Sequence, residues 1–159
     1  MSPTKQMLGL VVLILICFSA AGIGSVFTMP SVTDWYAGLR KPGWTPPGWL
    51  FGPVWTVLYL SMAVAAWLVW RRAGFSGAAV PLAAFGIQLA LNLVWSIIFF
   101  GQNNIGLALV DIVLLWIAIV ATIFAFRQVS IPAGWLLVPY LIWVTFAAAL
   151  NFSIWSLNR

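Results

Sequence analysis

The chain has 159 residues, of which 64% are hydrophobic and only 6% are charged. In an ordinary soluble domain roughly a quarter of the residues are charged, so this composition excludes a soluble globular protein. Long uncharged stretches are typical of membrane helices, and the sequence predicts one compact integral membrane domain over residues 1–159.

The residue types also exclude most enzyme chemistry. The chain has no His, one Cys and two carboxylates, so it cannot build a His-based metal site, a Ser-His-Asp triad or a paired-carboxylate hydrolase. We therefore predict no metal site and no required cofactor. The net charge of +5 comes from seven cations scattered at segment ends, and nucleic acid is not an expected partner.

Five apolar runs are long enough to span a bilayer, which needs roughly 20 residues. The sequence predicts an all-α bundle of five transmembrane helices over residues 6–27, 50–70, 80–100, 105–126 and 134–155. Three of the connections are short, so consecutive helices should be antiparallel neighbours. The alternative of a signal peptide, with Lys5 before an apolar run, is disfavoured because no charge interrupts Met7 to Thr33.

The first connection, residues 28–49, differs from the others. It holds Pro30, Pro42, Pro46 and Pro47, which should not continue a helix, together with several tryptophans. Its prolines reduce the entropy lost on ordering, and its aromatic rings can pack on the bundle. We expect this segment to fold over the bundle as a lid.

Five spans place the termini on opposite sides of the membrane. One side carries Lys5, Arg71, Arg72 and Arg127, and the other carries Arg40, Lys41 and Arg159. By the positive-inside rule, this small excess of cations on the N-terminal side favours a cytoplasmic N-terminus.

Polar and large aromatic residues gather in, or just past, the half of the bundle nearest the first connection. At a rise of about 1.5 Å per residue from the loop end, the depths are about 7 Å for Trp55, 12 Å for Asn92, 9 Å for Asp111, 6 Å for Asn151 and 18 Å for Trp143. Four different predicted helices contribute these residues, which predicts a cavity under the loop with aromatic walls and a few polar side chains. Helical spacing adds Tyr59 beside Trp55, Trp95 beside Asn92, and Ala147 between Trp143 and Asn151.

A second face of the third predicted helix carries small residues: Ala79, Ala83, Gly86 and Ala90. Helices approach closely on such a face, and we predict a homodimer through it. Simpler interpretations remain open at this stage. The loop tryptophans could be interfacial anchors, Asn92 could bond a neighbouring helix, and Asp111 could be a structural acid.

Several motifs resemble the TspO/MBR family, the tryptophan-rich sensory proteins of bacteria and the mitochondrial translocator protein. They are Lys41-Pro42-Gly43-Trp44-Thr45-Pro46-Pro47 in the loop, Gln88 to Trp95 in the third predicted helix, and Val138 to Trp143 with Leu150-Asn151-Phe152 in the fifth. The resemblance extends over nearly the whole chain.

This resemblance implies a five-helix bundle, usually dimeric, in a bacterial cell membrane. It also implies binding of porphyrins such as protoporphyrin IX, of haem and, in animal members, of cholesterol and benzodiazepine-type drugs. The implied ligand-binding positions are Trp35, Tyr36, Trp44, Trp55, Asn92, Trp95, Trp143 and Ala147. In the family, the positions of Trp55 and Asn92 bond a drug carbonyl, and that of Trp143 is implicated in light-dependent porphyrin degradation.

One departure concerns sterols. Where the animal proteins carry a cholesterol motif with a Tyr, this chain has Phe152, and Arg159 follows seven residues later. Such motifs are weak patterns, and cholesterol recognition through this one is not expected here.

The leading hypothesis is a membrane receptor or transporter-like protein, surrounded by lipid, that binds a flat tetrapyrrole. Tryptophan faces would stack on the macrocycle, and Arg40 and Lys41 would pair with its propionates. The first alternative is an enzyme that degrades porphyrin in light, with Trp143 as its redox-active aromatic residue. The second is a structural or regulatory membrane subunit, which predicts no saturable ligand.

Overall fold

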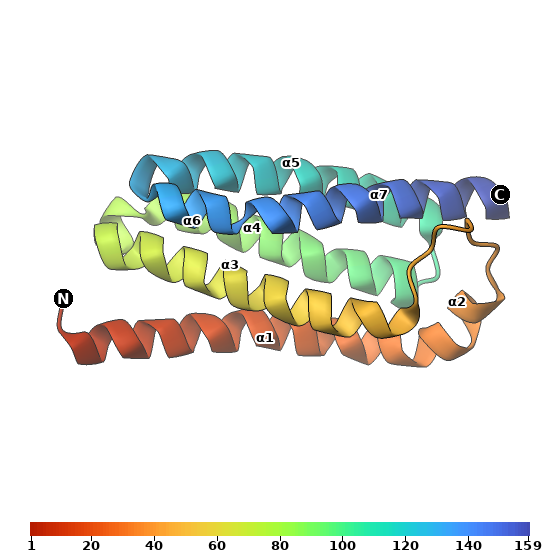
Figure 1. Ribbon diagram of the computed structural model, residues 1–159, viewed down its shortest axis with the longest axis horizontal. Coiled ribbons are helices and arrows are strands. Elements are labelled where there is room, and N and C mark those ends of the chain that lie inside the picture. Colours follow the sequence, from red (N-terminus) through yellow and green to blue (C-terminus); the bar gives the residue numbers. More distant parts are fainter.

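The computed structural model describes residues 1–159, and it consists of helices joined by short connections. The helices are α1 (Pro3–Thr33), α2 (Trp35–Gly38), α3 (Gly48–Gly77), α4 (Ala79–Ser96), the π-helix η1 (Ile97–Gly101), α5 (Ile105–Val129), α6 (Ile131–Leu136) and α7 (Val138–Asn158). The long helices lie side by side in an elongated bundle, with the N- and C-termini at opposite ends (Figure 1).

Five helical segments are long and apolar enough to cross a membrane, which confirms the predicted number of spans. They are Pro3–Thr33, Gly48–Gly77, Ala79–Gly101, Ile105–Val129 and Ile131–Asn158. Each contains the corresponding predicted run and extends beyond it at one or both ends, because polar residues can continue a helix outside the hydrocarbon layer. The outward faces are apolar, as lipid contact requires: Val26 and Ile142, for example, are well exposed.

The prediction that Pro30 ends the first helix is wrong. Pro30 lies inside α1, which continues to Thr33, so the connection between the first two spans is shorter than the predicted 28–49. Tertiary contact supports this last turn, because the Ser31 hydroxyl donates to the carbonyl of Phe100 at 2.6 Å. Thr28 also donates back to the carbonyl of Gly24, four residues earlier.

Several of the other helix ends have a local cause. Gly74, with φ of +69°, adopts a backbone conformation available to glycine and bends the end of α3 towards α4. Asn104 caps α5 by accepting from the backbone N–H of Leu107 at 3.0 Å. Pro132 and Pro139 stand in the first turns of α6 and α7, where no N–H is needed.

The core contains many alanines. Ala63, Ala65 and Ala66 of α3 are fully buried, and they allow neighbouring helices to approach closely.

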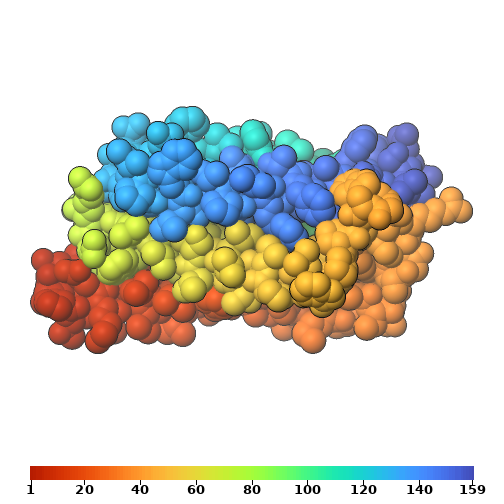
Figure 2. Space-filling view, viewed as in Figure 1, coloured from red at the N-terminus to blue at the C-terminus, as the bar shows by residue number.

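At the end of the bundle that holds the C-terminus, the segment between α2 and α3 crosses towards the end of α7. Figure 2 shows these orange loop residues packed beside the blue C-terminal helix.

Candidate ligand-binding cavity

A cavity of about 770 Å³ lies in the half of the bundle beneath the segment 34–47. This volume falls in the roughly 300–1,000 Å³ range of small-molecule sites. Residues of α1, α2, α3, α4, η1, α5 and α7 line it, as do residues of the loop. Nine of the residues singled out in the sequence line this cavity: Tyr36, Lys41, Trp55, Tyr59, Asn92, Trp95, Trp143, Ala147 and Asn151.

Tyr59 and Asn92, which line the cavity, form a chain of hydrogen bonds with Tyr140, which does not line it. The Tyr59 hydroxyl of α3 donates to Asn92 Oδ1 of α4 at 2.6 Å. Asn92 Nδ2 in turn donates to the hydroxyl of Tyr140 in α7 at 2.8 Å. All three residues are buried, and the two tyrosines leave one N–H of Asn92 free of a protein partner.

Asn151 also lines the cavity, but its amide is bonded within the protein. Its Oδ1 accepts from the Trp95 indole N–H at 3.0 Å, and its Nδ2 donates to the carbonyl of Ile105 at 3.0 Å. Asn151 therefore joins α7 to α4 and α5. A ligand that bonded this amide would have to compete with these contacts.

Aromatic rings form the walls. Trp143 lies between Phe51 and Phe146, with ring centroids 5.8 and 5.5 Å away. Trp95 stacks on Phe99 of the π-helix at 4.9 Å. Such pairs favour binding of another flat aromatic group, because offset and edge-on contacts add to the gain from burial.

Lys41 lies at the mouth of the cavity and is held by the short helix α2. Its ammonium donates to the carbonyls of Tyr36 at 2.8 Å, Leu39 at 3.0 Å and Ala37 at 3.4 Å, and it lies 4.8 Å from the Tyr36 ring centroid. These contacts use all three of its N–H donors. Burial raises the pKa of the Tyr36 phenol above its ordinary value.

Three residues predicted to bind ligand do not line the cavity. Trp35 packs behind its wall, 5.5 Å from the Phe99 ring, and Trp44 is 49% exposed and contacts Phe146. The side chain of Arg40 is exposed. The depth estimate places these positions at the correct end of the bundle, but it does not tell which side of the wall each occupies.

The prediction that Asp111 belongs to the cavity is also wrong. It lies on α5 at the expected end and is buried, yet it does not line the cavity, whereas its neighbour Ile112 does. Its Oδ2 atom has no hydrogen-bond partner. The helix turns this carboxyl group away from the cavity into the surrounding protein.

The structure adds residues that the sequence interpretation missed. Phe51 and Phe100 complete the walls. A stripe on α1 faces the same space, with Phe18, Ala21, Ser25, Thr28 and Val32 among its members. Their three- and four-residue spacing is the signal that could have identified this stripe.

Comparison with known proteins identifies the family. The chain matches the TspO/MBR family over residues 11–156. It is 48% identical over 158 residues to the tryptophan-rich protein TspO of Chlorobaculum tepidum, covering 97% of this chain and 98% of that protein. It is 46% identical over 139 residues to the Homo sapiens translocator protein, covering 86% and 82% of the two chains.

A third relative is the tryptophan-rich sensory protein of Cereibacter sphaeroides, which is 43% identical over 125 residues, or 79% of this chain and 77% of that protein. The match spans all five helices and the cavity between them. The chain therefore belongs to the TspO/MBR family of integral membrane proteins.

Proposed function

We propose that this protein binds a tetrapyrrole, with protoporphyrin IX as the representative ligand, in the cavity beneath the segment 34–47. Family membership supports a receptor- or transporter-like role in the membrane. The observation that carries the finer proposal is the cavity itself, about 770 Å³ of space with Trp55, Trp95 and Trp143 in its walls. We further propose that the membrane is a bacterial cell membrane, as the Chlorobaculum tepidum relative suggests.

The chemistry of the walls suits a flat, largely apolar macrocycle. Indole and phenyl faces offer stacking, while Asn92 retains one N–H that could meet a ligand acceptor. Lys41 is the one cationic residue that lines the cavity, so a propionate would bind there by displacing a backbone carbonyl from the ammonium group. Arg40 precedes it in the chain and keeps an exposed side chain that could serve as the second cation.

The lining residues favour a metal-free porphyrin over haem. No imidazole exists in the chain, and Cys17 is buried outside the cavity lining. Met29, Tyr36 and Tyr59 carry the only familiar iron ligands on its walls. No residue therefore provides the commonest axial ligand of haem iron.

A titration tests the proposal. Protein in nanodiscs is titrated with protoporphyrin IX while tryptophan fluorescence is followed, and we expect saturable quenching at one ligand per chain. Ala147→Phe should abolish it, because the added ring fills the cavity beside Trp143. The control is Ala149→Phe, which adds the same ring on an exposed face of α7. Quenching that rises without saturation, or equally in both variants, would reject the proposal.

The position of Trp143 supports a second candidate function, light-dependent porphyrin degradation. Its indole lines the cavity, where a bound macrocycle would contact it. The excited porphyrin and oxygen would supply the reactive chemistry, so acid-base groups are not needed. Loss of the porphyrin absorption band under illumination, abolished in Trp143→Phe, would separate degradation from binding alone. Absence of any saturable ligand would instead favour a structural or regulatory subunit.

A further inference from the structure

The end of the bundle opposite the cavity carries positive charge that no acidic side chain neutralises. Four exposed cations lie at this end: Lys5, Arg71, Arg72 and Arg127. The chain has only two carboxylate residues, and both belong to the half of the bundle that holds the cavity. Asp34 directly follows α1, and Asp111 lies in the second turn of α5. An anion that reaches the opposite end therefore meets cations alone.

One of these cations is held in place by an aromatic ring. The Arg71 guanidinium lies 4.5 Å from the centroid of the Trp67 ring, one turn earlier on α3. The Trp67 indole N–H in turn donates to the backbone carbonyl of Gln6 on α1 at 2.8 Å. Stacking holds the guanidinium by its face and leaves the N–H donors at its rim free for an anion.

The first turn of α1 brings a second cation to the same seam between α1 and α3. Gly9 lies directly against the Trp70 ring, and a Cβ atom at this position would clash with it. The two helices run antiparallel (Figure 1), so Lys5, one turn before Gly9, comes level with the turn of α3 that follows Trp70. Lys5 and Arg71 thus stand on the two sides of the seam, and their long side chains can reach one anionic group.

The depth of this seam is that of a lipid headgroup. The apolar run 50–70 ends directly before Arg71, so the guanidinium lies where hydrocarbon gives way to headgroups. Further into the membrane, α1 exposes Met7, Leu8 and Val11 beyond the Lys5 position. A phosphate bound at the seam would leave its acyl chains against these apolar side chains. Basic pockets between membrane helices bind anionic headgroups in this way.

We propose that Lys5, Trp67 and Arg71, here called the Arg71 site, bind the phosphate headgroup of an anionic phospholipid at the seam between α1 and α3. Arg71 forms a forked pair with two phosphate oxygens, and Lys5 supplies the second charge. The bound lipid fastens α1, the least buried span, with 17% of its apolar window buried against 33–39% for the others. No residue of the site lines the cavity, so this inference does not rest on the proposed function.

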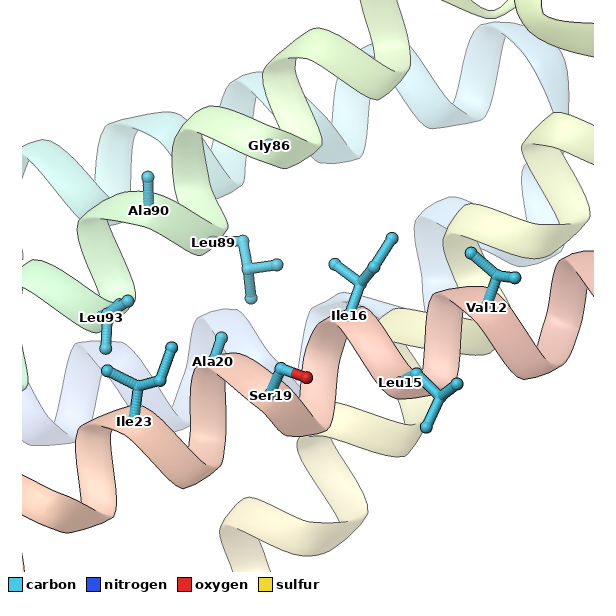
Figure 3. Close-up of a pocket in the computed structure, with 10 residues that line it drawn as sticks. All are labelled: Val12, Leu15, Ile16, Ser19, Ala20, Ile23, Gly86, Leu89, Ala90 and Leu93. Atoms are coloured by element: carbon cyan, nitrogen blue, oxygen red, sulfur yellow. The ribbon is translucent and has the colours of Figure 1, made fainter.

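The Arg71 site is also separate from the surface predicted to hold a second copy of the chain. A shallow groove of about 510 Å³ between α1 and α4 lies further along α1, from Val12 to Ile23 (Figure 3). Gly86 and Ala90 of the predicted dimer face border it on α4. No residue of the Arg71 site lines this groove.

Native mass spectrometry of the detergent-solubilised protein tests the proposal by titration with phosphatidylglycerol or phosphatidylcholine. We expect one phosphatidylglycerol per chain to bind in preference to phosphatidylcholine. Each cation at a lipid surface strengthens binding about fivefold, so Arg71→Gln should weaken phosphatidylglycerol binding about fivefold, and Arg71→Gln with Lys5→Gln about twenty-fivefold. Arg72→Gln is the matched control, because it removes the same charge from the next residue, which stacks on no ring. Its effect should stay below about twofold.

A second variant separates the stack from the charge. Trp67→Leu keeps every cation but removes the ring under Arg71, and phosphatidylglycerol binding should weaken about two- to fivefold. Thermal unfolding without lipid checks that each variant is folded, as expected for exposed Lys5 and Arg71.

Three results would overturn the proposal. Equal losses in Arg71→Gln and Arg72→Gln would show a general attraction of the basic end rather than a site. Equal binding of phosphatidylcholine would show that the headgroup charge is not recognised. Displacement of the lipid by inorganic phosphate would identify a site for a free anion instead of a lipid.

Discussion

The side chain of Asn158 pairs with both backbone groups of Arg40, residues that lie 118 positions apart in the sequence. The Arg40 N–H donates to Asn158 Oδ1 at 3.0 Å, and Asn158 Nδ2 donates to the Arg40 carbonyl at 2.8 Å. The last turn of α7 thus fastens the loop that covers the cavity. These two hydrogen bonds form a latch, and substitution of Asn158 can test whether the segment acts as a lid.

Asn158→Ala should loosen this loop. Two hydrogen bonds of about 1 kcal/mol each hold the latch, so its opening should become about five- to thirtyfold more frequent. Trypsin cleavage after Arg40 measures this opening, and Ser156→Ala on the same exposed turn is the control. Bound protoporphyrin IX should slow the cleavage, whereas equal cleavage with and without porphyrin would count against a lid.

Tyr140→Phe should destabilise the fold through Asn92. The substitution keeps the ring but removes the acceptor of a buried N–H, which costs about 1–2 kcal/mol. Thermal unfolding in detergent, compared with Tyr36→Phe as a control outside the membrane-spanning helices, gives the difference. Equal stability of the two variants would show that the bond between Asn92 and Tyr140 contributes little.

Trp143 and Asn92 should contribute differently to porphyrin binding. Asn92→Ala removes the hydrogen bond that its free N–H would donate to the ligand, worth about 1–2 kcal/mol, and should weaken binding about five- to thirtyfold. Trp143→Ala removes a stacking face and should weaken binding more. Trp143→Phe should keep the affinity and abolish any light-driven degradation. Unchanged dissociation constants in all three variants would place the ligand elsewhere.

Asp111→Asn should fold almost normally. Asp111 is buried, and its Oδ2 atom has no partner, so an ionised carboxylate there would be costly and the neutral amide should be tolerated. Expression yield and thermal stability in detergent measure the effect. A severe loss of folded protein would instead show that the acid itself has a required role.

A homodimer through α4 remains a prediction. Its four small residues, Ala79, Ala83, Gly86 and Ala90, are all exposed on the bundle surface. Ala83→Leu combined with Gly86→Leu should yield monomers that still bind porphyrin, as measured by light scattering in detergent. Dimers that persist would indicate another surface.

The sequence by itself determined the number of spans and the end of the bundle that holds the cavity. Uncharged runs of about 20 residues have few alternatives to a membrane helix, because every backbone polar group must be satisfied in lipid. A constant rise per residue then converts position into depth, which placed Trp55, Asn92 and Trp143 at one end. All three line the cavity.

Only the tertiary structure decided which side chains face that cavity. Depth fixes position along a helix but not rotation about its axis, so Asp111 lies at the expected end and faces away while Ile112 faces inward. Local propensity failed at Pro30, where the bond from Ser31 to Phe100 supports another helical turn. The contacts of Tyr140 and Asn158 join residues far apart in the chain, and such pairings depend on how the helices pack rather than on any local pattern.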